Sequence, residues 1–319
     1  MEFNTLLELQ GYFGTELTCA LYLERRRWGG MPTCPHCGSE AHSRTNTRLR
    51  HPELRTYKDF RCRACDRKYS VLTGTFFEGT KVDLKSWFAA MYLINSHKKG
   101  ISSLQLARDI GVTQKTAWFM LHRIRQMFIS EGGKMAGVVQ MDESYLGGDN
   151  DNRHADKKTK GAGGRSMQDK AAVVGMYSEG IVSVSVVPHT GASVLIKMAM
   201  DNCGESATVV TDGYASYRNM GKLFKHVVID HKKGRYASKD GRFHTNGIEN
   251  FWSCLKRSIY GIYHWTSHKH LFRYCHESAH RYNTRGMSEG GRFALCLSRA
   301  NGRLSYRELR ENPLSLYFP

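Results

Sequence analysis

Two spacings of apolar residues divide the chain near residue 130. Before that point, apolar side chains recur every three or four residues, which is the period of a helix. Helical spacing returns near 193–203 and from Ile248 onward. Between these segments, short β-rich runs predict strands at 137–148, 171–188, 207–217 and 226–230, with a hairpin turn at Ser178-Glu179-Gly180. Strands that alternate with helices predict an α/β layer fold for the second part of the chain.

The helical part is expected to contain two helices around a sharp turn, preceded by a longer helix that ends by Gly100. Ser102 or Ser103 caps the first, Gly111 makes the turn, and Thr113 caps the second. The longer helix buries Trp87, Met91 and Ile94, and the last helix buries Ala117, Met120, Leu121, Ile124 and Phe128. This order fits a DNA-binding helix-turn-helix, and it also fits an ordinary helical hairpin.

The charge balance favours the DNA-binding alternative. Lys and Arg number 47 against 29 Asp and Glu, which gives the 319 residues a net charge of +18. A surface this basic attracts a polyanion. A membrane is the poorer partner, because the mean hydropathy is −0.50 and no apolar run approaches the roughly 18 residues of a spanning helix. The candidate phosphate contacts are Lys98, Lys99, Lys115, Arg123 and Arg125.

Four of the nine cysteines form two C-x2-C pairs, Cys34/Cys37 and Cys62/Cys65. The N-terminus lacks the basic region of a signal peptide, so we expect a cytoplasmic protein with reduced cysteines. Two such turns that face each other form a tetrahedral structural Zn2+ site. A redox role would need a single motif in a thioredoxin-like setting. His36 lies inside the first pair, but four cysteines already complete the site.

Three acidic residues are candidates for a metal site. Asp142 lies inside an apolar strand, where burial is costly unless the group is paired or binds a metal. Asp212 ends another strand, and Asp212-Gly213 also fits a simple turn. Glu249 opens a helix. Together they form an all-oxygen set suited to two Mg2+ or Mn2+ ions, which can support phosphodiester cleavage.

Glu249 also fits a purely structural role. In HTNGIENFWSCLKR (244–257), Asn246 is the expected N-cap and Glu249 the third helical residue, as in a capping box. The Gly- and Lys-rich segment 153–170 likewise has two interpretations, a flexible surface loop or a DNA clamp beside Asp142. Its GAGGRS stretch lacks the ending of a P-loop.

Six blocks in this order resemble bacterial insertion-sequence transposases of the DDE type, which carry an N-terminal zinc ribbon and are related to eukaryotic Merlin elements. The resemblance covers roughly residues 15–285. The matching blocks are CPHCGS (34–39), residues 60–87, residues 98–125, MDESYLGG (141–148), VVTDGYASY (209–217) and HTNGIENFWSCLKR (244–257).

The resemblance implies an RNase H-like catalytic domain that cleaves element ends and transfers the 3′-hydroxyls into target DNA. It assigns Asp142, Asp212 and Glu249 as the three acids, and Lys256 as the basic residue that follows them. Some relatives use asparagine at the third position, so Asn246 is a secondary candidate, together with His244. The expected partners are double-stranded DNA, as terminal inverted repeats and target, and a second copy of the chain.

The expected domains are an N-terminal helical segment (1–30), a zinc ribbon (31–80), a helix-turn-helix (81–130), an RNase H-like domain (131–285) with a basic loop (150–170), and a C-terminal tail of unassigned role (286–319). The expected location is the cytoplasm, at the nucleoid. Two alternatives are an RNase H-like nuclease or resolvase, and a domesticated DNA-binding regulator. Such a regulator would have no reason to keep the acid set.

Overall fold

The chain forms two compact units, which are described separately. Unit 1 comprises Met1–Phe128 and Met287–Pro319, and unit 2 comprises Ile129–Gly286. The computed structural model describes residues 3–46, 57–129, 132–147, 156, 170–230, 237–238 and 240–311. The predicted basic loop 150–170 therefore lies outside the described residues, apart from Asp156 and Lys170.

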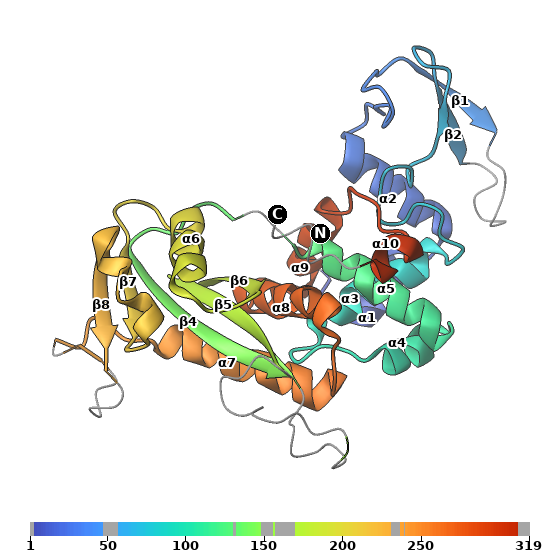
Figure 1. The fold of residues 1–319 in the computed structure, drawn as a ribbon. Helices are drawn as coiled ribbons and strands as arrows, with labels where there is room; N and C mark the ends of the chain where they lie inside the picture. Colours follow the sequence, from blue (N-terminus) through green and yellow to red (C-terminus); the bar gives the residue numbers. More distant parts are fainter. Residues whose placement is uncertain are drawn as a thin grey trace. The chain divides into compact units, whose positions relative to one another are not determined.

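Unit 1 combines a small sheet with a helical core. Its strands β1 (His42–Asn46), β2 (Lys58–Cys62) and β3 (Lys68–Tyr69) pair antiparallel in that order. Its helices are α1 (Leu6–Tyr12), α2 (Glu16–Trp28), α3 (Leu84–Ser96), α4 (Ser103–Ile110), α5 (Gln114–Met127), α9 (Glu289–Ser298) and α10 (Tyr306–Arg310) (Figure 1).

The predicted caps of α4 and α5 are confirmed. The Ser102 hydroxyl accepts from the backbone N–H of Gln105, and Thr113 caps α5 in the same way. Gly111 ends α4 in the left-handed conformation, with φ 68°. The predicted apolar stripe of α5 is buried. Helix α3 ends at Ser96, four residues before Gly100. Directly after it, the ring nitrogen Nδ1 of His97 lies 2.7 Å from the carbonyl oxygen of Leu93.

The C-terminal segment, to which the sequence assigned no role, returns to unit 1. The ring of Phe293 on α9 lies 5.3–5.8 Å from the rings of Phe3, Phe13 and Phe88. The Phe76 N–H donates to the Ala300 carbonyl at 2.9 Å. Residues from both ends of the chain therefore share one core.

Unit 2 is built on a mixed five-stranded sheet, which confirms the predicted α/β layer. Strands β5 and β6 are antiparallel and joined by a tight turn, where Glu179 (φ 48°) and Gly180 (φ 87°) adopt positive φ. Strands β7 and β8 run parallel to β4. The sheet order is β6 (Ile181–Val187), β5 (Lys170–Ser178), β4 (Val138–Gly147), β7 (Thr208–Asp212) and β8 (Lys225–Ile229).

Helices complete unit 2: α7 packs on β4 and β5, and α8 packs on β6 (Figure 1). The helices are α6 (Ala192–Asn202), α7 (Asn246–Ser258), the π-helical turn η7 (Ile259–Tyr263) and α8 (His268–Asn283), with 3-10 turns η4 (Ala215–Tyr217) and η5 (Met220–Lys222). Within the described ranges, no helix has the length and apolar character needed to cross a bilayer.

Candidate functional site

Asp142 and Asp212 lie on neighbouring parallel strands. Strand β4 pairs with β7 so that Val138 faces Thr208 and Gln140 faces Val210. The same offset, continued by two residues, brings Asp142 beside Asp212, the last residue of β7. Because strand side chains alternate between faces, both carboxylates project from the same face of the sheet.

Helix α7 runs along β4 in the same direction. The Ile248 N–H donates to the Gln140 amide oxygen at 3.0 Å, and the Trp252 indole N–H donates to Asp142 Oδ2 at 2.9 Å. Further on, the hydroxyl of Tyr260 lies 3.4 Å from the carbonyl oxygen of Gly147. These contacts occur in the same order along both elements, so Glu249, within α7, lies on the covered face of the sheet.

Two glycines allow this close approach. A Cβ on Gly175 of β5, which pairs with Asp142, would lie 2.7 Å from the side chains of Ile248 and Trp252. A Cβ on Gly247 of α7 would lie 2.4 Å from the ring of Tyr177. Only residues without a side chain fit at these two crossings, and they fix the distance between helix and sheet.

The environment of Asp142 disfavours its negative charge. Burial is the main reason that the pKa of Asp142 is raised to about 6, and the charges of Asp212 and Glu249 act in the same direction. The backbone N–H of Glu143 and the indole N–H of Trp252 oppose the rise. A carboxylate held this way gains from a nearby cation, and oxygen donors suit a hard divalent ion.

Glu249 is exposed in the first turn of α7, and its cap differs from the prediction. The N-cap is Thr245, not Asn246, and its side chain makes no capping bond to the helix backbone. Instead, the Thr245 hydroxyl donates to Glu249 Oε1 at 2.6 Å. The Gln140 amide oxygen accepts the Ile248 N–H, which the side chain of a local N-cap would otherwise accept. Glu249 is therefore not needed as a structural cap.

The other predicted residues of this segment have different surroundings. Asn246 and Lys256 are exposed on α7. His244 is half-buried, and its Nδ1 lies 3.3 Å from the Gln140 amide nitrogen. Asp212 also serves a turn, since its Oδ1 accepts from the Tyr214 N–H at 2.9 Å. The two interpretations of Asp212 are therefore compatible.

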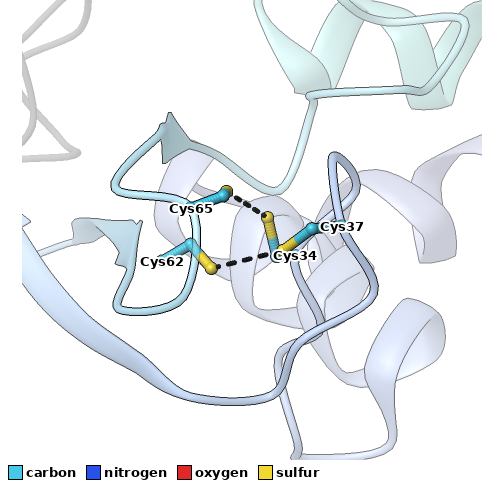
Figure 2. Close-up of side chains that lie close together, drawn as sticks. All are labelled: Cys34, Cys37, Cys62 and Cys65. Atoms are coloured by element: carbon cyan, nitrogen blue, oxygen red, sulfur yellow. Dashed lines mark hydrogen bonds between the residues drawn. The ribbon is translucent and has the colours of Figure 1, made fainter.

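The four cysteines of the two C-x2-C pairs form the expected cluster in unit 1. Their sulfurs all lie within 4.8 Å of one another, and Figure 2 shows the two pairs facing each other from separate turns. The Sγ distances are 3.8 Å for Cys34–Cys65 and 3.6 Å for Cys37–Cys62. A tetrahedron with Zn–S bonds of about 2.3 Å has edges of about 3.8 Å, so the cluster fits zinc.

The carboxylates converge less tightly than the cysteines. Within the part of the chain that the structure describes, the cysteine cluster is the one group of three or more His, Cys, Asp or Glu residues whose ligand atoms lie this close together. Asp142, Asp212 and Glu249 are electrostatic neighbours, but their oxygen atoms do not all lie within such a radius.

The basic candidates of unit 1 separate into two groups. Lys98, Lys99 and Lys115 are exposed. Arg123 and Arg125 are buried, with 7% and 1% of their surface exposed. The Arg123 guanidinium donates to the carbonyls of Leu304, at 2.9 Å, and Glu78, at 3.3 Å. Because both guanidinium groups are buried, we remove these arginines from the expected phosphate contacts.

Sequence reasoning missed Gln140, Trp252 and Gly175, which position the acids. A signal for two of them was present. Gly175 interrupts an otherwise apolar strand, which often marks a close approach of another element. Trp252 follows Glu249 by three residues and so lies near it on the helix. Nothing local indicated Gln140, since its partner is 108 residues away.

We expect Gly175→Ala to weaken unit 2, because the new methyl group must displace Ile248 or Trp252. Overpacking of this kind costs roughly 1–3 kcal/mol in the free energy of unfolding. Urea unfolding followed by tryptophan fluorescence measures the loss. Gly261→Ala is the control, since a Cβ there meets nothing within 4 Å. Equal stabilities for the two variants would contradict the close packing.

Zinc content tests the cysteine cluster. The purified chain should hold about one zinc ion, as a four-cysteine site requires. Cys34→Ser should lose the ion and open the ribbon to proteolysis, because folding of such sites is coupled to metal binding. Cys254→Ser is the matched control, since Cys254 is partly exposed and lies outside the cluster. Undiminished zinc in Cys34→Ser would refute the site.

Segments of both units match the family models of transposase domains. Residues 14–68 match the family model of the transposase zinc-ribbon domain, and residues 134–283 match that of the ISXO2-like transposase domain. A Halobacterium salinarum protein, described as an uncharacterized protein in transposable element ISH50, is 28% identical over 255 residues. The match covers 77% of this chain and 83% of that protein. The chain thus carries a region similar to the transposase zinc-ribbon domain, followed by a region similar to the ISXO2-like transposase domain.

Proposed function

We propose that this chain is a transposase that binds the terminal inverted repeats of its element, hydrolyses a phosphodiester at each end, and joins the freed 3′-hydroxyls to target DNA. One observation carries the proposal. Asp142 and Asp212 stand side by side on parallel strands, and α7 brings Glu249 to the same face. The charges of Asp212 and Glu249 both reach the buried carboxylate of Asp142, and a set of oxygen donors of this kind suits a divalent cation.

The acids would hold Mg2+ or Mn2+, which supplies activation of water and stabilisation of the leaving oxygen. Each supporting residue orients one ligand. The indole N–H of Trp252 fixes Oδ2 of Asp142. The Thr245 hydroxyl orients Glu249 in the same way. These bonds hold the carboxylates in place before DNA arrives.

Lys256 is the expected DNA contact beside the acids. It is exposed and follows Glu249 by seven residues, which corresponds to two turns and about 10 Å along the helix. Its ammonium group would bind the phosphate backbone near the cleaved bond. Because the adjoining face of α7 packs on the sheet, this position is fixed relative to Asp142.

We further infer that unit 2 is an RNase H-like domain. Its sheet has three parallel strands, β4, β7 and β8, extended by an antiparallel hairpin, and it carries the acids on β4, β7 and the helix packed across them. This arrangement of acids supports the inference.

Unit 1 is proposed to read the inverted repeats. Helices α4 and α5, with their Gly111 turn, would form the helix-turn-helix, and the zinc ribbon would bind beside it. Lys98, Lys99 and Lys115 are the remaining phosphate contacts. Since two element ends must be joined, we expect two or more copies of the chain on the DNA.

Asp142→Asn should abolish nicking and joining of oligonucleotides that carry the inverted repeats. The amide keeps the Trp252 contact but removes the charge, and we expect a rate loss of about a thousandfold or more. Binding of the same oligonucleotides should persist. Asp201→Asn, an exposed position on α6, is the control. Full activity of Asp142→Asn with Mg2+ or Mn2+ would exclude the assignment.

The third ligand can be identified with paired variants. If Glu249 holds the cation, Glu249→Gln should raise the Mn2+ concentration needed for half-maximal cleavage by about tenfold or more, whereas Asn246→Ala should change it little. Manganese binding followed by electron paramagnetic resonance gives a readout that does not depend on cleavage. The reverse pattern would move the third position to Asn246.

A further inference from the structure

One exposed stripe runs along α7 from the proposed metal site. Glu249, Ser253 and Lys256 on α7 and Tyr260 in the following turn η7 succeed each other at intervals of three or four residues, and all four are exposed. The adjoining face is buried through Ile248, Phe251, Trp252, Leu255 and Ile259. From Glu249 to Tyr260 the stripe extends about 16 Å along the axis.

Two aromatic side chains near the far end of the stripe are exposed to solvent. Tyr260 is 48% exposed and Trp265 is 70% exposed, whereas the other four tryptophans are buried or half-buried. Between them, His264 takes a positive φ of 59°. Its ring nitrogen Nδ1 lies 3.2 Å from the carbonyl oxygen of Tyr260. Defined contacts therefore hold this end of the helix.

Basic residues lie close to the two aromatic residues along the chain. Lys256 and Arg257 precede Tyr260, and His264 and His268 flank Trp265; all four are exposed. Single exposed apolar residues need no partner, and the chain has others, such as Leu7 at 79%. The combination of open rings with cationic groups is different. It is typical of surfaces that bind single-stranded nucleic acid, where bases stack on rings and cations hold the backbone.

We propose that Tyr260 and Trp265 form a stacking site for unpaired bases at the DNA end that the acids cleave. The proposal rests on the proposed function and adds a ligand class to the same helix. At 3.4 Å per nucleotide, 16 Å corresponds to about five nucleotides. The bases that stack therefore lie within about five positions of the cleaved bond, and melting of the terminal base pairs makes them available.

The test uses the full-length protein and two short duplexes that carry the inverted repeat, one fully paired and one with four mismatched pairs at the cleaved end. The wild type should bind the mismatched duplex more tightly. Trp265→Ala should lose about tenfold of that affinity and little for the paired duplex. 2-Aminopurine placed within five positions of the end should be quenched by the wild type and not by Trp265→Ala. Tyr12→Ala, which removes an exposed aromatic ring (50% exposed) from unit 1, is the control.

Other results would overturn the proposal in distinct ways. Equal preference for the mismatched duplex in wild type and Trp265→Ala, with cleavage intact, would remove the stacking site and leave the proposed function standing. If Trp265→Ala instead turned a dimer into a monomer in light scattering, with unchanged discrimination, the rings would form a contact between copies. Failure of the wild type to bind or cleave either duplex would reject both proposals.

Discussion

The close packing of α7 on the sheet is the constraint on which the site depends. Gly175 and Gly247 each stand where a methyl group would collide with a neighbour, at 2.7 Å and 2.4 Å respectively. At each crossing the glycine backbone lies directly against a neighbouring side chain, so the helix is close to the sheet. This lets the Gln140 amide oxygen accept the Ile248 N–H and the Trp252 indole N–H donate to Asp142. A wider spacing would break both bonds at once. The position of Glu249 relative to the strand acids is therefore set by two residues that carry no side chain.

A comparable dependence holds unit 1 together. The C-terminal segment supplies Phe293 to the aromatic core and the Leu304 carbonyl to Arg123. Arg123 belongs to α5, the second helix of the proposed helix-turn-helix, so that helix is completed by residues about 180 positions later in the chain. A buried guanidinium needs such partners, because an unpaired charge in the interior is costly. The tail is thus part of the module that we propose reads DNA.

The sequence was most informative where structure is local. The apolar period predicted the strands and helices, and Ser102, Gly111 and Thr113 were identified as caps because capping involves neighbours within a few residues. It was least informative where a distant residue intervenes. Asn246 looked like a cap because asparagine favours that position, yet the N-cap is Thr245 and the Ile248 N–H is satisfied by Gln140 from strand β4. Arg125 looked like a surface charge because helical spacing does not reveal what covers a helix.

The electrostatics of Asp142 give the strongest reason to regard this packing as functional. Its pKa is raised from an ordinary value of 3.8 to about 6, and burial is the main cause. At pH 7 Asp142 is mainly ionised in both states, but its ionisation is less favourable in the folded state. This difference lowers the free energy of unfolding by roughly 3 kcal/mol. The cost vanishes below about pH 4, where both states are protonated, and reaches its full size above about pH 6. An apolar residue would avoid it. In the function that we propose, a bound divalent cation would offset this cost, because it would stabilise the ionised form in the folded state alone. Metal binding and folding would then be coupled through this one side chain.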